Sequence, residues 1–225
     1  MINRILLLSL AIYLLGYFVL SLDPSDGNGW YNKGARLHNR GEDVDALDAY
    51  NRAAELIPLE DDVWYNRGQV LLDLERFDEA LASYDKAIEI EPGLSDVWSM
   101  RGSALRELGR YQEALSSYDR SIKLDARSSV TWNNRGATYE ALGEYERALD
   151  DHNHSIVLES DYYWAWHRRG IALESMGNHT EALASYRKAI EIHPGLCESI
   201  ERRDDLIDLL NAQQVANQTP SHTAY

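Results

Sequence analysis

The stretch Trp64-Tyr65-Asn66-Arg67-Gly68 decides the fold, because the same pattern returns throughout the chain. The pattern is a tryptophan, two variable residues, a basic residue and a glycine. Its tryptophan recurs every 34 residues, and five of the six tryptophans belong to the series. A fixed period of this size indicates a repeat architecture in which each repeat is one supersecondary unit. The five tryptophans are Trp30, Trp64, Trp98, Trp132 and Trp166.

Each repeat contains two stretches of about a dozen residues with helical apolar periodicity, separated by a turn. Four turns carry a glycine, which adopts the left-handed conformation that ends a helix at little cost, and Glu75 replaces it in the second repeat. A proline closes the second stretch in three repeats. Because Ala126 and Ser160 replace that proline in the third and fourth repeats, we expect slightly longer second helices there. The turn glycines are Gly41, Gly109, Gly143 and Gly177, and the prolines are Pro58, Pro92 and Pro194.

The glycine of the pattern lies within the first helical stretch of every repeat. A glycine inside a helix costs about 1 kcal/mol relative to alanine, so five in register predict a close helix crossing. An aromatic residue of the second stretch is expected to pack there, with His152 in that place in the fourth repeat. The glycines are Gly34, Gly68, Gly102, Gly136 and Gly170, and the aromatic residues are Tyr50, Tyr84, Tyr118 and Tyr186.

Tryptophan, glycine, alanine, tyrosine and proline in this order and at this period resemble the tetratricopeptide repeat family. The resemblance covers about Gly27 to Leu196. It implies an all-α fold, a right-handed α-solenoid of stacked helix-turn-helix repeats with a concave groove lined by the first helices. A polar cap is required at the end of such an array. We expect five repeats at residues 27–60, 61–94, 95–128, 129–162 and 163–196, a C-terminal capping helix at 197–215 and a disordered tail at 216–225.

The amino terminus lies outside the repeat pattern. Ile5 to Leu22 contains eighteen residues without charge, which make roughly 27 Å of helix, close to the hydrocarbon thickness of a bilayer. Residues 1–22 are therefore predicted to be a transmembrane signal anchor, followed by a linker at 23–26. The repeats of this single-pass membrane protein are expected on the non-cytoplasmic side. The alternative is a cleaved signal peptide and a secreted or periplasmic protein.

The composition argues against several function classes. The formal net charge is −15, from 37 acidic and 22 basic residues, which disfavours a nucleic-acid partner because phosphate recognition needs clustered Lys and Arg. The single cysteine, Cys197, allows neither an intrachain disulfide nor a cysteine-based metal site. His152 and His154 are two residues apart and do not share a helix face. We predict no metal site, no cofactor and, since no catalytic motif occurs, no enzymatic activity.

The basic residue of the pattern invites a second functional interpretation. A row of cations could bind an acidic ligand, but the position follows the core pattern, so bracing between neighbouring repeats is the better interpretation. The residues are Lys33, Arg67, Arg101, Arg135 and Arg169.

If the geometry of the family holds, the exposed groove positions are those that vary around the tryptophan and the glycine. Their amide groups can pair with a peptide backbone, and their aromatic and methionine surfaces can hold side chains. Some family members clamp a chaperone's terminal carboxylate with lysine at fixed first-helix positions; here those positions carry no lysine, so this activity is not assigned. The predicted partner-binding residues are Tyr31, Asn32, Tyr65, Asn66, Gln69, Met100, Arg106, Asn133, Asn134, Trp164, His167 and Arg168.

The function predicted from these features is that of a membrane-tethered scaffold or adaptor that binds a peptide or protein partner in its groove. The alternative is an assembly or biogenesis factor for a membrane or envelope complex.

Overall fold

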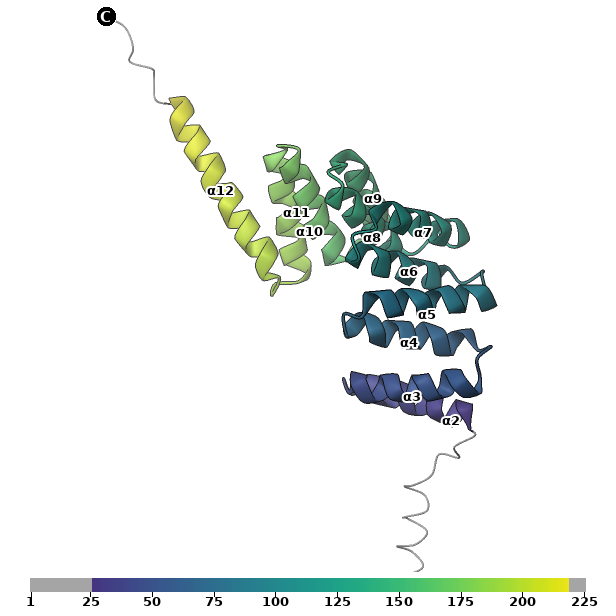
Figure 1. Ribbon diagram of the computed structural model, residues 1–225. Coiled ribbons are helices and arrows are strands. Elements are labelled where there is room, and N and C mark those ends of the chain that lie inside the picture. Colours follow the sequence, from purple (N-terminus) through teal and green to yellow (C-terminus); the bar gives the residue numbers. More distant parts are fainter. Residues whose placement is uncertain (1–25, 219–225) are drawn as a thin grey trace, which may run out of the picture. The chain divides into compact units, whose positions relative to one another are not determined.

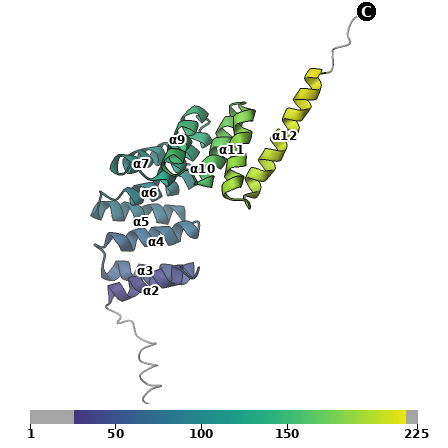
Figure 2. The ribbon, with the colours of Figure 1, turned by 180° about the vertical axis from the view of Figure 1, so that it is seen from behind.

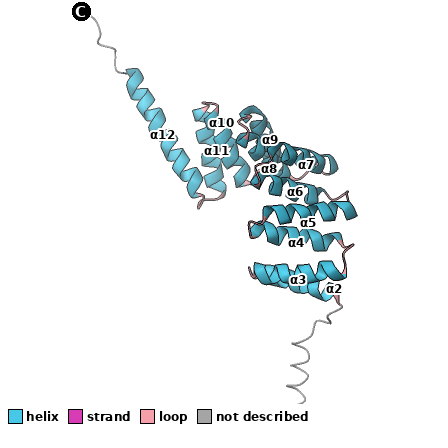
Figure 3. Cartoon of the chain, in the orientation of Figure 1, coloured by secondary structure: helices cyan, strands magenta, loops and turns pink. Residues whose placement is uncertain are grey.

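The computed structural model describes residues 26–218, and over this range the chain consists of helices and turns (Figure 3). It divides into two compact units between Gly93 and Leu94, here unit 1 (residues 26–93) and unit 2 (residues 94–218). Unit 1 contains α2 Gly27–His38, α3 Asp43–Leu56, α4 Asp61–Asp73 and α5 Phe77–Ile90. Unit 2 contains α6 Ser95–Glu107, α7 Tyr111–Leu124, α8 Ser129–Ala141, α9 Tyr145–Leu158, α10 Tyr163–Ser175, α11 His179–Ile192 and α12 Cys197–Gln218.

Consecutive helices form antiparallel pairs, which Figures 1 and 2 show from opposite sides. The pairs are α2 with α3 and α4 with α5 in unit 1, and α6 with α7, α8 with α9 and α10 with α11 in unit 2. Within each unit the second helix of a pair packs on the first helix of the next. The all-α, stacked-pair fold expected from the sequence is thus confirmed for these residues, and the right-handed winding of the whole solenoid stays a prediction.

The helix crossings explain the glycines of the first helices. A Cβ atom on Gly102 would lie 2.7 Å from Cε1 of Tyr118, and one on Gly34 would lie 2.9 Å from Cδ1 of Tyr50. Both rings are fully buried. At these distances a methyl group and an aromatic ring cannot coexist without displacement, which confirms the predicted close approach.

The turns between paired helices adopt the left-handed conformation. The backbone φ is +71° at Gly109 and between +74° and +78° at the other three turn glycines, and Glu75 has the same conformation at φ +57°. In the third repeat, Gly109 N donates to Arg106 O at 2.9 Å and Arg110 N donates to Leu105 O at 2.9 Å. These bonds satisfy carbonyl groups that the end of a helix leaves unpaired.

The prediction of longer second helices in the third and fourth repeats is wrong. α7 and α9 each contain 14 residues, the same number as α5, which precedes a proline turn. The indole Nε1 of Trp132 donates to the carbonyl of Ala126 at 2.8 Å, and Trp166 does the same to Ser160 at 2.9 Å. Trp64 makes the equivalent bond to Pro58 at 2.9 Å. The tryptophan of the next repeat therefore holds the turn with or without proline.

Helix α12 packs against α11 at the end of unit 2. Its Leu206 is 3% exposed and lies in a hydrophobic cluster with Leu173, Ala182 and Tyr186. The helix continues to Gln218, three residues beyond the predicted end of the capping helix. This packing covers the apolar face of the last repeat pair, as the end of a stacked array requires.

The expected single-pass membrane localisation needs correction. Among the helices of residues 26–218, none is both long enough and apolar enough to cross a membrane. The segment 1–22, on which that expectation was based, lies outside the described residues, as do the linker residues 23–25 and residues 219–225 of the predicted tail.

Candidate functional site

In unit 1 the predicted groove residues come from α2 and α4 and meet one another. Asn66 Nδ2 donates to the hydroxyl of Tyr31 at 3.3 Å and to the carbonyl of Asp62 at 2.7 Å. Gln69 Nε2 donates to the hydroxyl of Tyr65 at 3.0 Å. Four of these predicted residues are half-buried and the fifth, Asn32, is exposed. The first helices of unit 1 thus present two hydrogen-bonded pairs of amide and tyrosine side chains.

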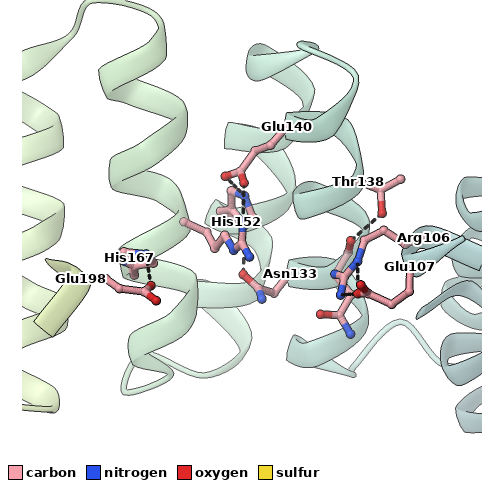
Figure 4. A network of polar contacts seen from close by, with 10 residues as sticks. Arg106, Glu107, Asn133, Thr138, Glu140, His152, His167 and Glu198 are labelled. Carbon is pink, nitrogen blue, oxygen red and sulfur yellow. Dashed lines mark hydrogen bonds and ion pairs between the residues drawn. The ribbon is translucent and has the colours of Figure 1, made fainter. Parts of the chain in front are cut away.

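In unit 2 a polar network joins α8, α9 and α10. His152 is fully buried, and Figure 4 shows it between Asn133 and Glu140. Its Nδ1 lies 3.1 Å from Asn133 Oδ1, and its Nε2 lies 3.0 Å from Glu140 Oε1. The other carboxylate oxygen of Glu140 accepts a bond from Arg168 Nη1 at 2.9 Å. Arg168 on α10 is therefore held by a buried carboxylate of the preceding repeat.

Two opposing influences act on the pKa of Glu140. Burial is the largest, and it raises the pKa because it disfavours the carboxylate. The hydrogen bonds from His152 and Arg168, together with their charges, outweigh it. The net pKa lies below the ordinary range of a glutamate, so Glu140 is an anion at neutral pH.

His167 of α10 faces the terminal helix. Its Nδ1 lies 2.7 Å from Ser199 Oγ and its Nε2 lies 3.3 Å from Glu198 Oε2, the contact drawn in Figure 4. Burial lowers the pKa of the imidazole, and it does so against the attraction of Glu198. The ring of Trp164 meets the ring of His167 edge-on at 5.8 Å. His167 thus joins α10 to α12.

A pocket of about 280 Å³ opens beside this contact, between α10 and α12. Its walls carry two guanidinium groups, two carboxylates, an imidazole and one aliphatic side chain. The lining residues are His167, Arg168, Ile171, Glu198, Glu201 and Arg202. Arg202 also donates to Glu174 at 3.1 Å. The pocket therefore contains both positive and negative groups, and the side chain of Arg168 is exposed to solvent there.

The remaining predicted residues of unit 2 differ in their surroundings. Arg106 donates from Nη2 to Glu107 at 2.7 Å, a contact visible in Figure 4, and its side chain is 26% exposed. Met100, Asn134 and Trp164 are half-buried. Among the described residues the side-chain amide of Asn134 has no hydrogen-bond partner, so both of its polar groups remain available to a ligand.

The structure corrects the expected exposure of two predicted groove residues. Asn133 is 5% exposed and His167 is 2% exposed, because both are taken up by contacts to His152 and Ser199. A ligand on the surface cannot reach either side chain without displacing these contacts. The other ten predicted residues are half-buried or exposed, and their role in partner binding stays a prediction.

The recurring basic residues brace the repeats. Arg67 donates from Nε to Asn51 of the preceding repeat at 2.7 Å and from Nη1 to Ser83 of its own repeat at 2.5 Å. Arg169 repeats this arrangement with Asn153 and Ser185 at 2.9 and 2.5 Å. The side chains also lie over the tryptophans of their own repeats, Arg67 at 5.9 Å and Arg169 at 5.9 Å. The structural interpretation is confirmed for Arg67 and Arg169.

The fourth repeat uses an ionic version of the same brace. Arg135 makes two bonds to the carboxylate of Asp151, at 2.8 and 2.7 Å, and one to Asp119 at 2.7 Å. Asp151 is 4% exposed and stands where the second, third and fifth repeats have serine. A buried carboxylate needs such a paired geometry, because an unpaired one is strongly destabilising.

Sequence reasoning missed the partners that the cap supplies. Glu198 and Arg202 of α12 reach the surface of the first helices only through tertiary packing. It also missed a cluster of His38, Asp43 and Asp73 in unit 1, whose ligand atoms all lie within 4.8 Å of one another. The available signal was the departure of His38 and Asp43 from the residues at the same positions in the other repeats.

Family comparisons agree with this geometry. Two tetratricopeptide repeat models match the chain, one at residues 61–94 and 163–196 and the other at 83–116, and a further TPR repeat model matches residues 102–143. The chain belongs to the tetratricopeptide repeat family. The tetratricopeptide fold is in general a non-catalytic scaffold for protein interaction. No curated protein matches the chain.

Solved structures show the same tetratricopeptide fold. TTC0263, a thermophilic TPR protein of Thermus thermophilus, is 23% identical with a TM-score of 0.66, over 80% of this chain and 98% of that one. YrrB, described as a TPR protein with an unusual peptide-binding site, is 22% identical with a TM-score of 0.64, over 81% and 94%. The first TPR of Spaghetti (RPAP3), bound to the HSP90 peptide SRMEEVD, is 26% identical with a TM-score of 0.51, over 52% and 93%.

Proposed function

We propose that this tetratricopeptide repeat protein is a scaffold that binds an extended peptide segment of its partner along the first helices of its repeats. The observation that carries the proposal is the unused hydrogen-bonding capacity on those helices. Asn66 donates from its NH2 group, while its Oδ1 accepts no bond among the described residues. The amide of Asn134 occupies the same register in the fourth repeat and is free at both ends. Such amides can pair with a peptide backbone without dictating its sequence.

Aromatic surface next to these amides supports the proposal. Tyr31 and Tyr65 are half-buried, and their rings lie 5.9 and 6.2 Å from those of Tyr50 and Tyr84. In unit 2, Trp164 offers a half-buried ring close to Arg168, whose side chain is 38% exposed. Rigid aromatic and arginine side chains of this kind dominate the binding energy at protein interfaces. The similar domain of Spaghetti, solved with a bound peptide, supports a peptide as the ligand.

The test uses peptides selected from a random library for binding to the full chain. The variant Asn66→Ala, Asn134→Ala and Arg168→Ala combined is expected to bind them at least tenfold more weakly, because each change removes a ligand-facing polar group. The matched control replaces three exposed cations of second helices with alanine, Lys86, Arg147 and Lys188. It is expected to bind like the original chain.

Circular dichroism of each variant establishes that the helices are retained. If the triple variant binds the peptides as tightly as the original chain, the peptide does not bind on the first helices. The same conclusion follows if the control variant loses as much affinity as the triple variant. The alternative of an assembly factor stays a prediction, which the same selection does not address.

A further inference from the structure

We propose that unit 1 carries a binding site for a divalent transition-metal ion, such as Zn²⁺, built from His38, Asp43 and Asp73. The three residues belong to different helices, the last residue of α2, the first of α3 and the last of α4. One ligand atom from each lies within 4.8 Å of the others. The site is separate from the peptide surface proposed above, and the two proposals can fail independently.

The hydrogen bond of the imidazole orients the ring for metal binding. His38 Nδ1 lies 2.9 Å from Asp43 Oδ1, a distance at which Nδ1–H donates to the carboxylate. In the neutral form of the ring the lone pair then lies on Nε2, which faces Asp73 Oδ2 at 3.8 Å. Metal-binding histidines commonly donate their second ring nitrogen to a carboxylate in this way. We therefore assign Nε2 and Asp73 as the direct ligands, and Asp43 as the positioning residue.

The distance between His38 Nε2 and Asp73 Oδ2 is closer to that of two ligands of one metal ion than to that of a hydrogen bond. At 3.8 Å, Nε2 and Oδ2 are too far apart for a hydrogen bond. Two ligands of a tetrahedral zinc ion lie about 3.4 Å apart, given metal–ligand distances of about 2.1 Å. A small rotation of the Asp73 side chain, which is 56% exposed, closes this difference. The exposure also gives the ion an entry path and room for the waters that complete its coordination.

The charges around the cluster favour a cation. Among the described residues, neither Asp43 nor Asp73 forms an ion pair with lysine or arginine, and His38 is the partner of both. Elsewhere in the described residues, carboxylates that form ion pairs usually do so with arginine or lysine, as Glu79 does with Arg76 at 2.7 Å. The two carboxylates bring two negative charges to the imidazole, which a divalent ion would balance.

The repeat pattern marks the same residues as exceptional. Position 38 is leucine, arginine or glutamate in the other repeats, at Leu72, Arg106, Glu140 and Glu174. Position 43 is aromatic in each of them, at Phe77, Tyr111, Tyr145 and His179. The first repeat departs from the pattern at both positions, and its two substituted side chains contact each other. Packing of the array does not call for this pair, since four repeats do without it.

The ligand chemistry selects the class of ion. One imidazole nitrogen with carboxylate oxygens suits Zn²⁺, Co²⁺ or Ni²⁺, whereas Mg²⁺ and Ca²⁺ prefer oxygen alone. Isothermal titration of the full chain with ZnCl₂, in a Cys197→Ser background that removes the only thiol, tests the site. We expect one zinc ion per chain, and no heat from MgCl₂ at the same concentration.

Three variants and one control separate this site from stray histidines. His38→Leu, which introduces the residue of the second repeat, and Asp73→Asn are each expected to weaken zinc binding at least tenfold. Asp43→Asn is expected to weaken it by about 10 to 100 times, as the loss of an orienting carboxylate does. The control His154→Ala removes an exposed histidine of unit 2 and is expected to change nothing.

The proposal is overturned if the original chain binds no zinc. It is equally overturned if both His38→Leu and Asp73→Asn bind zinc as the original chain does. Asp73 is exposed at the end of α4, so Asp73→Asn folds and keeps the test decisive even if His38→Leu proves unstable. The visible spectrum of bound Co²⁺ gives a second measurement, because a direct ligand change alters it.

Discussion

Glu75 holds a backbone conformation that its four counterparts hold with glycine. Its φ is +57°, and the corresponding glycines range from +71° to +78°. A side chain in this region suffers a clash between its Cβ atom and the following carbonyl, which costs about 1–2 kcal/mol. The turn forms nonetheless, with Arg76 N donating to Leu71 O at 2.8 Å. Packing of α4 against α5 therefore imposes the conformation on a residue that does not favour it.

Replacing Glu75 with glycine is predicted to stabilise the protein by about 0.5–1 kcal/mol. The strain is relieved, and part of the gain is offset by the greater chain entropy of glycine in the unfolded state. Urea denaturation followed by circular dichroism measures the change. The reciprocal variant Gly109→Ala is expected to destabilise by about 1 kcal/mol, and through conformation alone, since a Cβ atom there has no neighbour within 4 Å. A stabilising Gly109→Ala would contradict this account.

At the scale of the elements, Trp64, Trp132 and Trp166 each act on the turn that follows the preceding helix. The indole of Trp132 bonds the carbonyl of Ala126, so α7 ends where α5 ends although no proline follows it. Asp125, the residue after α7, is extended at φ −141° and ψ 108°. An extended residue of this kind is the conformation that a following proline requires.

The variant Ala126→Pro is therefore predicted to leave α7 unchanged and to stabilise the protein by about 0.5 kcal/mol, through a stiffer unfolded chain. Thermal denaturation and the helical circular dichroism signal check both parts. The variant Trp132→Phe should lower the free energy of unfolding by about 1 kcal/mol, because one hydrogen bond is lost. The loss should be the same whether position 126 is alanine or proline. A loss of helical signal in Ala126→Pro would show that α7 depends on the amide of residue 126.

At the scale of the whole molecule, acid should weaken the folded state through His167. Burial holds its folded pKa below the ordinary value of 6.5. As the pH falls below 6.5, the unfolded chain therefore binds a proton that the folded chain does not, and the free energy of unfolding decreases. The contribution is fully present above pH 6.5, and its loss by pH 5.5 is at most about 1.4 kcal/mol.

The variant His167→Asn, which carries the residue of the fourth repeat at this position, is predicted to lose this part of the pH dependence. The free energy of unfolding is measured in urea at pH 7.5 and pH 5.5 for both proteins. His154→Asn, at an exposed histidine, serves as the control and should keep the full decrease. An identical decrease in the original chain and in His167→Asn would exclude His167 as the source.

Much of the architecture follows from the sequence because a repeated packing constraint leaves a repeated mark. Each helix crossing excludes a side chain, so glycine recurs at Gly34 and Gly102 opposite buried tyrosines. The left-handed turns recur for a similar local reason at Gly41 and Gly109. Helix pairs, turns and bracing arginines are thus readable from spacing alone. The length of α7 could not be predicted in the same way. The turn that follows it is held by the indole of Trp132, which bonds to the carbonyl of Ala126 from six residues further along the chain.

The sequence by itself determined the repeat period, the helix pairs and the family of this protein, because these depend on contacts that every repeat makes in the same way. Tertiary structure alone decided which variable residues face solvent. Asn133 and His167 occupy the same repeat position as Tyr31 and Tyr65, yet both are buried. Their polar atoms contact His152 and Ser199 instead of solvent. It alone also brought His38, Asp43 and Asp73 together from three helix ends. These contacts involve residues that occur in one repeat alone, so a repeating sequence pattern does not predict them.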